Sequence, residues 1–145
     1  MRRSMDLVDS YSVVITDRLR DCRDFYRRWF GFEVGFEANW FVLLQGGGSR
    51  PVTLAFMHTD HPSSPPAPAE YHGDGAFLTF QVADAEAEHH RLVEDGLTPD
   101  LALTDEPWGQ RRFGVVDPAG MWIDVVEQIE PAAGWWNTYL ETSAQ

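Results

Sequence analysis

The stretch that decides the fold runs from Trp108 to Glu127 and reads WGQRRFGVVDPAGMWIDVVE. Residues 112–116 and 122–127 each read as a strand. The four residues between them, DPAG, are typical of a tight turn, because Asp bonds to nearby backbone, Pro fixes φ and Gly accepts a positive φ. We therefore predict a β-hairpin.

The rest of the chain divides into two halves with the same order of predicted elements. A proline-rich segment at 59–69 separates them, and it is incompatible with a helix or a central strand. In the first half we predict a strand at 10–16, a helix that Asp17 caps and Gly31 ends, and strands at 32–37, 40–45 and 52–58. In the second half we predict a strand at 76–82, a helix from an Asp84 cap through Glu94 that Gly96 ends, and strands at 100–103, 112–116 and 122–127.

Composition limits the class of protein and its partners. The chain of 145 residues is 43% hydrophobic, which suits one domain with a real core. Its net charge is 11 − 23 = −12, and such a surface repels nucleic acid and anionic lipid. We therefore expect no nucleic-acid partner, and the charge favours a cationic ligand if it serves more than solubility.

Sequence features also indicate a cytoplasmic location. No apolar run approaches the ~20 residues of a membrane span, so we expect no membrane association. The basic start of the chain has no hydrophobic region behind it and is no secretory signal. Cys22 is the only cysteine, which excludes an intramolecular disulfide and agrees with a reducing compartment.

The hairpin resembles the last two strands of the vicinal oxygen chelate superfamily, which includes glyoxalases, bleomycin-resistance proteins, fosfomycin-inactivating enzymes and extradiol dioxygenases. Residues 25–34, FYRRWFGFEV, are similar to the F-Y-x-x-x-L-G-F phrase that closes the first helix in many members. The resemblance covers about residues 8–128. It implies an α+β fold in which two βαβββ modules form a cupped mixed sheet. The tail segment 131–140, PAAGWWNTYL, adds a candidate for a short amphipathic helix that packs on the outer core, forms a dimer seam or roofs a pocket.

These features predict a single domain, with a first module at about 8–58, a linker at 59–74, a second module at about 75–128 and a C-terminal tail at 129–145.

The metal enzymes of this superfamily take their ligands from the first and last strand of each half. The matching positions here are Ser10, Thr53, Phe77 and Asp124. A transition metal needs roughly three or more His or carboxylate ligands. Only Asp124 qualifies, so we expect no metal and no other cofactor.

Alternation along the strands predicts which side chains line the cup. The predicted ligand-binding residues are Trp122, Asp124, Phe77, Thr79, Gln81, Ser10, Ser12, Thr53 and Met57, with Trp108 as part of a roof. Aromatic rings with a few polar groups are typical of a small-molecule pocket, unless the cup is closed by its own side chains. A carboxylate in such surroundings needs a cation or hydrogen-bond donors nearby.

Without a metal-ligand set, the chain resembles the bleomycin-resistance and related drug-sequestering members. That resemblance implies a metal-independent protein that binds an aromatic or cationic compound, such as an antibiotic, in clefts shared by a homodimer. One alternative is a metal-dependent lyase, isomerase or dioxygenase of the same superfamily. Another is a non-catalytic, ligand-responsive partner protein.

Overall fold

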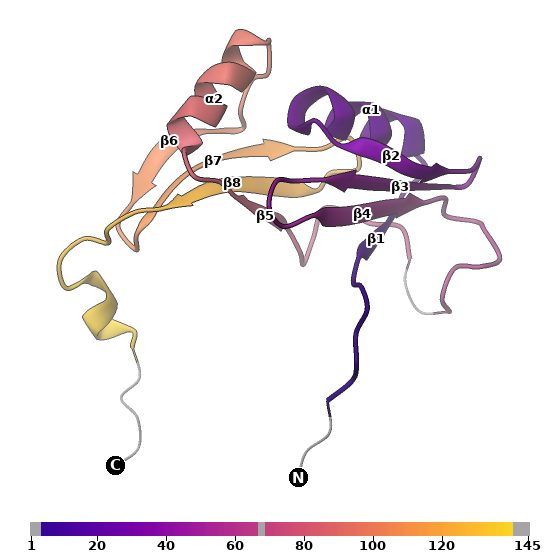
Figure 1. The fold of residues 1–145 in the computed structure, drawn as a ribbon, viewed down its shortest axis with the longest axis horizontal. Coiled ribbons are helices and arrows are strands. Elements are labelled where there is room, and N and C mark those ends of the chain that lie inside the picture. The colour runs from indigo at the N-terminus through magenta and orange to yellow at the C-terminus, as the bar shows by residue number, and fades with distance from the viewer. Residues whose placement is uncertain (1–3, 67–68, 141–145) are drawn as a thin grey trace. The chain divides into compact units, whose positions relative to one another are not determined.

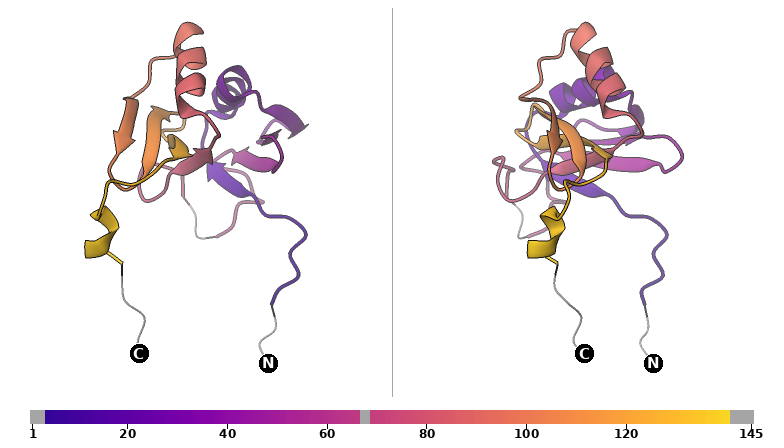
Figure 2. Two further views of the ribbon diagram at one scale, coloured as in Figure 1. Left: turned by 60° about the vertical axis from the view of Figure 1, so that its left-hand side comes forward. Right: turned by 90° about the vertical axis from the view of Figure 1, so that its left-hand side faces the viewer.

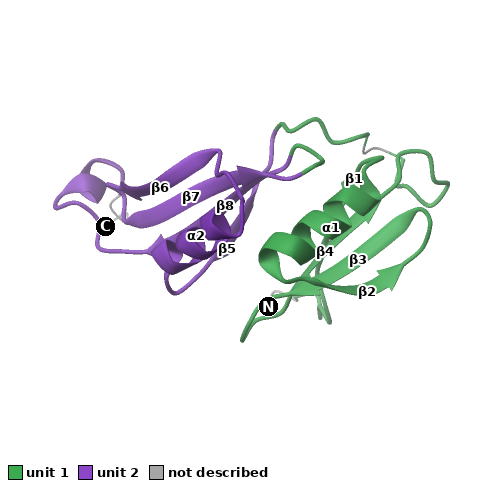
Figure 3. Ribbon diagram, turned by 90° about the horizontal axis from the view of Figure 1, so that it is seen from above, with its two compact units in different colours: residues 1–74, 118–120 green, residues 75–117, 121–145 purple. Residues whose placement is uncertain are grey.

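A computed structural model describes residues 4–66 and 69–140 of the chain (Figure 1), which form two compact units (Figure 3). Unit 1 comprises residues 1–74 and 118–120, and unit 2 comprises residues 75–117 and 121–145. Each unit has a strand, a helix and three further strands in that order. The predicted α+β class with two βαβββ modules is therefore confirmed. Among the described residues, no helix is long and apolar enough to cross a bilayer.

In unit 1, one four-stranded sheet packs against one helix. The strands take the order β1-β4-β3-β2, with β1 and β4 parallel and the other pairs antiparallel. Their bounds are β1 Ser12–Ile15, α1 Leu19–Phe30, β2 Glu33–Glu37, β3 Phe41–Gly46 and β4 Val52–Met57. Tyr26 of α1 is fully buried, and its ring lies 5.5 Å from Phe56 and 5.6 Å from Phe32. The aromatic face of α1 is thus part of the core of this unit.

The predicted start of α1 is wrong by one residue. Its N-cap is Arg18, whose backbone N–H donates to Thr16 Oγ1 at 3.1 Å. Asp17 instead accepts a hydrogen bond of 2.7 Å from the hydroxyl of Thr59 and lies 3.3 Å from His58 Nε2. The predicted end is confirmed, because Gly31 takes the left-handed conformation at φ 69° and its N–H donates to Tyr26.

The pairing of β1 with β4 shows which face each β1 side chain occupies. Ser12 pairs with Leu54, and Val14 pairs with Phe56, the residue that contacts α1. Because paired residues in a parallel ladder share a face, Ser12 lies on the helix-covered face, and its predicted place in the cup is wrong. The β4 residues Thr53 and Met57 alternate with Phe56 and lie on the opposite face.

In unit 2, the sheet has the order β5-β8-β7-β6, with β5 and β8 parallel. The bounds are β5 Leu78–Gln81, α2 Ala85–Glu94, β6 Leu101–Glu106, β7 Gln110–Val116 and β8 Trp122–Gln128, followed by a 3-10 turn, η1, at Trp135–Thr138. Asp84 caps α2 as predicted, accepting the N–H of Ala87 at 3.0 Å. Helix α2 covers one face of the sheet, where His89 lies edge-on to Phe113 with ring centroids 5.2 Å apart. Figure 2 shows η1 and α2 at opposite ends of this unit.

The hairpin between β7 and β8 forms as predicted. Asp117 Oδ1 accepts the N–H of Met121 at 2.9 Å, and Gly120 has φ 90°. The turn fixes the register by pairing Val116 with Trp122. Positions further along the hairpin then pair in order, including Gly114 with Asp124.

Candidate functional site

The candidate site lies on the face of the unit 2 sheet opposite α2, which we call the open face. Phe113 points to α2, so its neighbours Arg112 and Gly114 point to the open face. The register places Asp124 of β8 directly opposite Gly114, and Thr79 of β5 beside Asp124 on its other side. The hairpin and β5 thus bring polar side chains together at the centre of this face.

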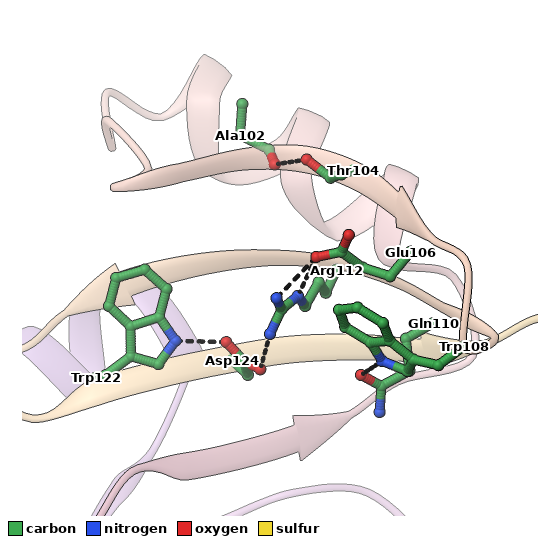
Figure 4. Close-up of polar contacts among 8 residues, drawn as sticks. All are labelled: Ala102, Thr104, Glu106, Trp108, Gln110, Arg112, Trp122 and Asp124. Carbon is green, nitrogen blue, oxygen red and sulfur yellow. Dashed lines mark hydrogen bonds and ion pairs between the residues drawn. The ribbon is translucent and has the colours of Figure 1, made fainter. Parts of the chain in front are cut away.

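Arg112 is the centre of a charged network (Figure 4). Its Nε–H donates to Glu106 Oε2 at 2.8 Å, and its Nη2 lies 2.7 Å from the same oxygen. Its Nη1 donates to Asp124 Oδ2 at 3.0 Å. The side chains of Arg112, Glu106 and Asp124 are only 25%, 16% and 5% exposed, so water screens these contacts weakly.

The charge state of Arg112 follows from these contacts. Burial alone lowers the pKa of this guanidinium, but the hydrogen bonds that it donates to Glu106 and Asp124, together with the negative charges of these two groups, outweigh burial and hold the pKa above its ordinary value. Arg112 therefore keeps its positive charge. One cation and two carboxylates give the network a net charge of −1 when both carboxylates are ionised.

Asp124 is satisfied within the chain. Oδ2 accepts from Arg112, and Oδ1 accepts from Nε1–H of Trp122. The sequence predicted that a carboxylate in these surroundings would need a cation or donors, and the structure supplies one of each. Both oxygens of Asp124, a predicted ligand-binding residue, thus already have partners within the chain.

Trp122 occupies the space that a side chain at position 114 would fill. A Cβ built on Gly114 would lie 2.7 Å from Cε2 and 2.8 Å from Cη2 of Trp122, which is closer than real Cβ atoms approach. Only glycine lets the indole lie across β7 at this point. The same position sets Trp122 Nε1 against Asp124.

Trp108 lies on the other side of the network, on the turn between β6 and β7 (Figure 4). Its ring centroid is 5.0 Å from Cζ of Arg112, within the range of a cation–π contact. Its Nε1–H donates to Gln110 Oε1 at 2.9 Å. Trp108 and Trp122, both predicted as ligand-binding residues, therefore flank Arg112 and Asp124.

The other predicted site residues fall into two groups. In unit 2, Phe77 precedes β5 and is 60% exposed, whereas Gln81 lies in β5 and accepts a hydrogen bond of 3.1 Å from Gln128. The residues in unit 1 are Ser10, Ser12, Thr53 and Met57. Ser10 precedes β1 and its N–H bonds to Asp9, so it is not a strand residue as predicted. The structure brings together Trp108, Trp122, Asp124 and Thr79.

Sequence reasoning missed Arg112, Glu106 and Gln110. A signal for Arg112 was present. Counting outward from the DPAG turn pairs Gly114 with Asp124, and Arg112, two residues before Gly114, lies on the same face as Asp124. Glu106 gave no such signal, because the predicted strand ended at Leu103 whereas β6 continues to Glu106.

Comparisons with known proteins define the family. The model of the glyoxalase/bleomycin resistance protein/dioxygenase superfamily matches residues 8–125, and the chain belongs to this superfamily. No curated protein sequence matches the chain.

Solved structures share the fold at low sequence identity. A glyoxalase/bleomycin resistance protein/dioxygenase from Nocardioides is 18% identical, with a TM-score of 0.71 over 89% of this chain and 87% of its own. TioX from Micromonospora sp. ML1 is 18% identical, with a TM-score of 0.65 over 82% and 97%. A lactoylglutathione lyase from Agrobacterium tumefaciens is 18% identical, with a TM-score of 0.66 over 86% and 96%. At this identity the similarity establishes the fold alone.

The residues at the superfamily's metal positions do not fit a transition metal. Phe77 offers no donor atom, and both oxygens of Asp124 are engaged by Arg112 and Trp122. Ser10 and Thr53 are hydroxyl residues, which are poor ligands for such ions. Within residues 4–66 and 69–140, no group of three or more His, Cys, Asp or Glu side chains is arranged to hold an ion. These four residues therefore do not form a transition-metal site of the kind that the superfamily's metal enzymes use.

Proposed function

We propose that this protein binds a planar, positively charged aromatic small molecule on the open face of unit 2 and leaves it chemically unchanged. The observation that carries the proposal is the pair of indoles, Trp108 and Trp122, flanking a largely buried ion network of net charge −1 (Figure 4). Such a site offers a ligand both stacking and a charge partner.

Stacking supplies the affinity for flat rings. An aromatic pair contributes about 0.5–1.5 kcal/mol beyond the burial of its surface. Trp122 is held in place by Gly114 below it and by Asp124 at its N–H, so little conformational entropy is lost when a ring stacks on it. A rigid platform of this kind favours planar ligands over flexible ones.

Charge supplies the preference for a cation. Glu106 uses Oε2 for Arg112, and its Oε1 has no hydrogen-bond partner among the described residues. A ligand ammonium or amidinium group can pair with this oxygen without displacing Arg112. The net charge of −12 on the whole chain also attracts cations over longer distances.

The same contacts argue against catalysis by this network. Arg112 has a raised pKa and does not release a proton. Asp124 has both oxygens occupied, so it is badly placed to accept a proton from a substrate. We infer a sequestering role, of the kind that protects a cell from a toxic aromatic compound such as an antibiotic.

A fluorescence titration tests this function. The probes are proflavine, a planar cation, and acridone, a neutral planar molecule of similar size. Proflavine is expected to quench tryptophan emission with higher affinity than acridone, and to be recovered unchanged by mass spectrometry. Trp122→Ala is expected to lower the affinity for proflavine more than tenfold. Phe36→Ala, which removes a 56% exposed ring in unit 1, is expected to leave that affinity unchanged. Equal loss in both variants, or no quenching by either probe, contradicts the proposal.

A further inference from the structure

We infer that the C-terminal segment 129–140 positions Trp108 against Arg112, which makes Trp136 a positioning residue of the ligand site. The inference extends the proposed function and rests on it for its consequence in binding. Its structural part concerns only contacts within unit 2, and it is testable without a ligand.

The segment is anchored to the turn between β6 and β7 at three consecutive carbonyl groups. The N–H of Ala132 donates to Pro107 at 2.8 Å, and the N–H of Ile129 donates to Gly109 at 2.8 Å. Between them, Nε1–H of Trp136 donates to the carbonyl of Trp108 at 2.8 Å. A turn held at every one of these carbonyls has little freedom to move, so the backbone of Trp108 is fixed from the tail.

The turn and the tail also approach each other too closely for a side chain. Gly109 has φ 108°, and a Cβ built on it would lie 2.9 Å from the carbonyl oxygen of Ile129. Glycine is therefore required at this position both for the backbone conformation and for the contact. This close fit is a second observation that the tail is docked specifically.

The ring of Trp108 is held as well as its backbone. The indole of Trp135 lies 5.8 Å from it, at an interplanar angle of 50°. Arg112 approaches the Trp108 ring at 5.0 Å, and Gln110 accepts its N–H. The chain of contacts thus runs from the tail through Trp108 to the guanidinium at the centre of the site.

Trp136 is the point at which this coupling can be tested with least disturbance. In two of the three anchoring hydrogen bonds the donor is a backbone N–H, and only in that of Trp136 is the donor a side chain. Trp136→Phe keeps an aromatic ring in place and removes the donor. Tyr139→Phe is the matched control, because Tyr139 lies in the same segment and its ring contact with Trp135 at 4.7 Å does not need the hydroxyl.

The experiment compares 1H–15N spectra of the full-length chain without ligand. In Trp136→Phe, the Nε–H signals of Trp108 and Arg112 are expected to shift, while the indole signal of Trp122 stays in place, since the described contacts of Trp122 are with Gly114 and Asp124. Tyr139→Phe is expected to leave all three signals unchanged. Unshifted Trp108 and Arg112 signals in Trp136→Phe overturn the inference.

Two further measurements keep the test decisive. Gly109→Ala disturbs the same contact from the side of the turn and is expected to shift the same signals, which covers the case in which Trp136→Phe fails to fold. Proflavine is expected to bind Trp136→Phe about threefold to tenfold more weakly than the parent chain, the range that one hydrogen bond supports. If the signals shift but the parent chain does not bind proflavine, the positioning role stands and the proposed function fails.

Discussion

At the scale of single residues, Asp124 shows how far a sequence can identify a site. The resemblance of the hairpin to a known family singled out Asp124, and solvation chemistry required a cation or donors for it. The sequence analysis did not name Arg112, because that step needs the strand register, which the length of the turn sets. Once Val116 is paired with Trp122, Arg112 falls on the same face as Asp124.

Asp124→Asn is expected to alter ligand selectivity. The amide still accepts from Trp122, but the network changes from a net charge of −1 to neutral. Proflavine should therefore lose much more affinity than acridone. The chain should also lose about 1–3 kcal/mol of unfolding free energy, because Arg112 keeps only Glu106 as an ionic partner. Fluorescence titration and urea unfolding measure the two effects. Equal loss of both probes would show that charge plays no part in recognition.

Gly114→Ala is expected to displace Trp122. The added methyl would overlap the indole, and overpacking of this kind costs about 1–3 kcal/mol. The indole N–H signal of Trp122 should shift, and proflavine should bind more weakly. Gly48→Ala is the control, because a Cβ at Gly48 meets no atom within 4 Å. An unchanged Trp122 signal in Gly114→Ala would contradict the described position of the ring.

At the scale of elements, the starts of the two helices show that one local pattern predicts a helix cap correctly in one case and wrongly in the other. Asp17 and Asp84 each precede a helical stretch, and both were predicted to cap. Asp84 does so, with Ala87. Asp17 binds Thr59, a residue 42 positions away, and the helix begins one residue later. A distant partner overrode the local preference, and the sequence gives no sign of it.

Asp17, which was predicted to cap α1 and instead binds Thr59, has a pKa that can be measured. The hydrogen bond from Thr59 lowers the pKa of Asp17 below its ordinary value of 3.8, and His58 contributes in the same direction. Because the folded pKa is depressed, this contact stabilises the fold above pH 3.8 and is lost as the pH falls through the lowered value. Thr59→Val is expected to raise the pKa of Asp17 toward 3.8, as followed by NMR of its carboxyl carbon. A pKa that does not move would mean that Thr59 is not the main cause.

At the scale of the whole molecule, the sequence predicted the repeated βαβββ architecture but only part of the site. The repeat was visible because a Pro-rich segment separates two similar successions of strand and helix patterns. The site was less visible because its central contacts join residues on three different strands and a turn. Trp122 and Asp124 followed from alternation along one strand, which is local. Glu106 required the true end of β6, which pairs with Gln110 across the turn.

The last prediction concerns assembly, and we propose that the chain forms a homodimer. After the tail has docked on its own turn, Tyr139 and Leu140 remain 61% and 64% exposed, and exposed apolar groups of this size favour burial in an interface. Light scattering at micromolar concentration should give about twice the chain mass of 16.5 kDa.

Leu140→Asp should shift the mass toward the monomer, because it places a charge in the proposed seam. Leu7→Asp, at a side chain that is 66% exposed near the other end of the chain, should not. A monomeric parent chain would exclude the dimer, and a dimer that persists in Leu140→Asp would place the interface elsewhere. Neither result would affect the contacts of Arg112, which lie within one chain.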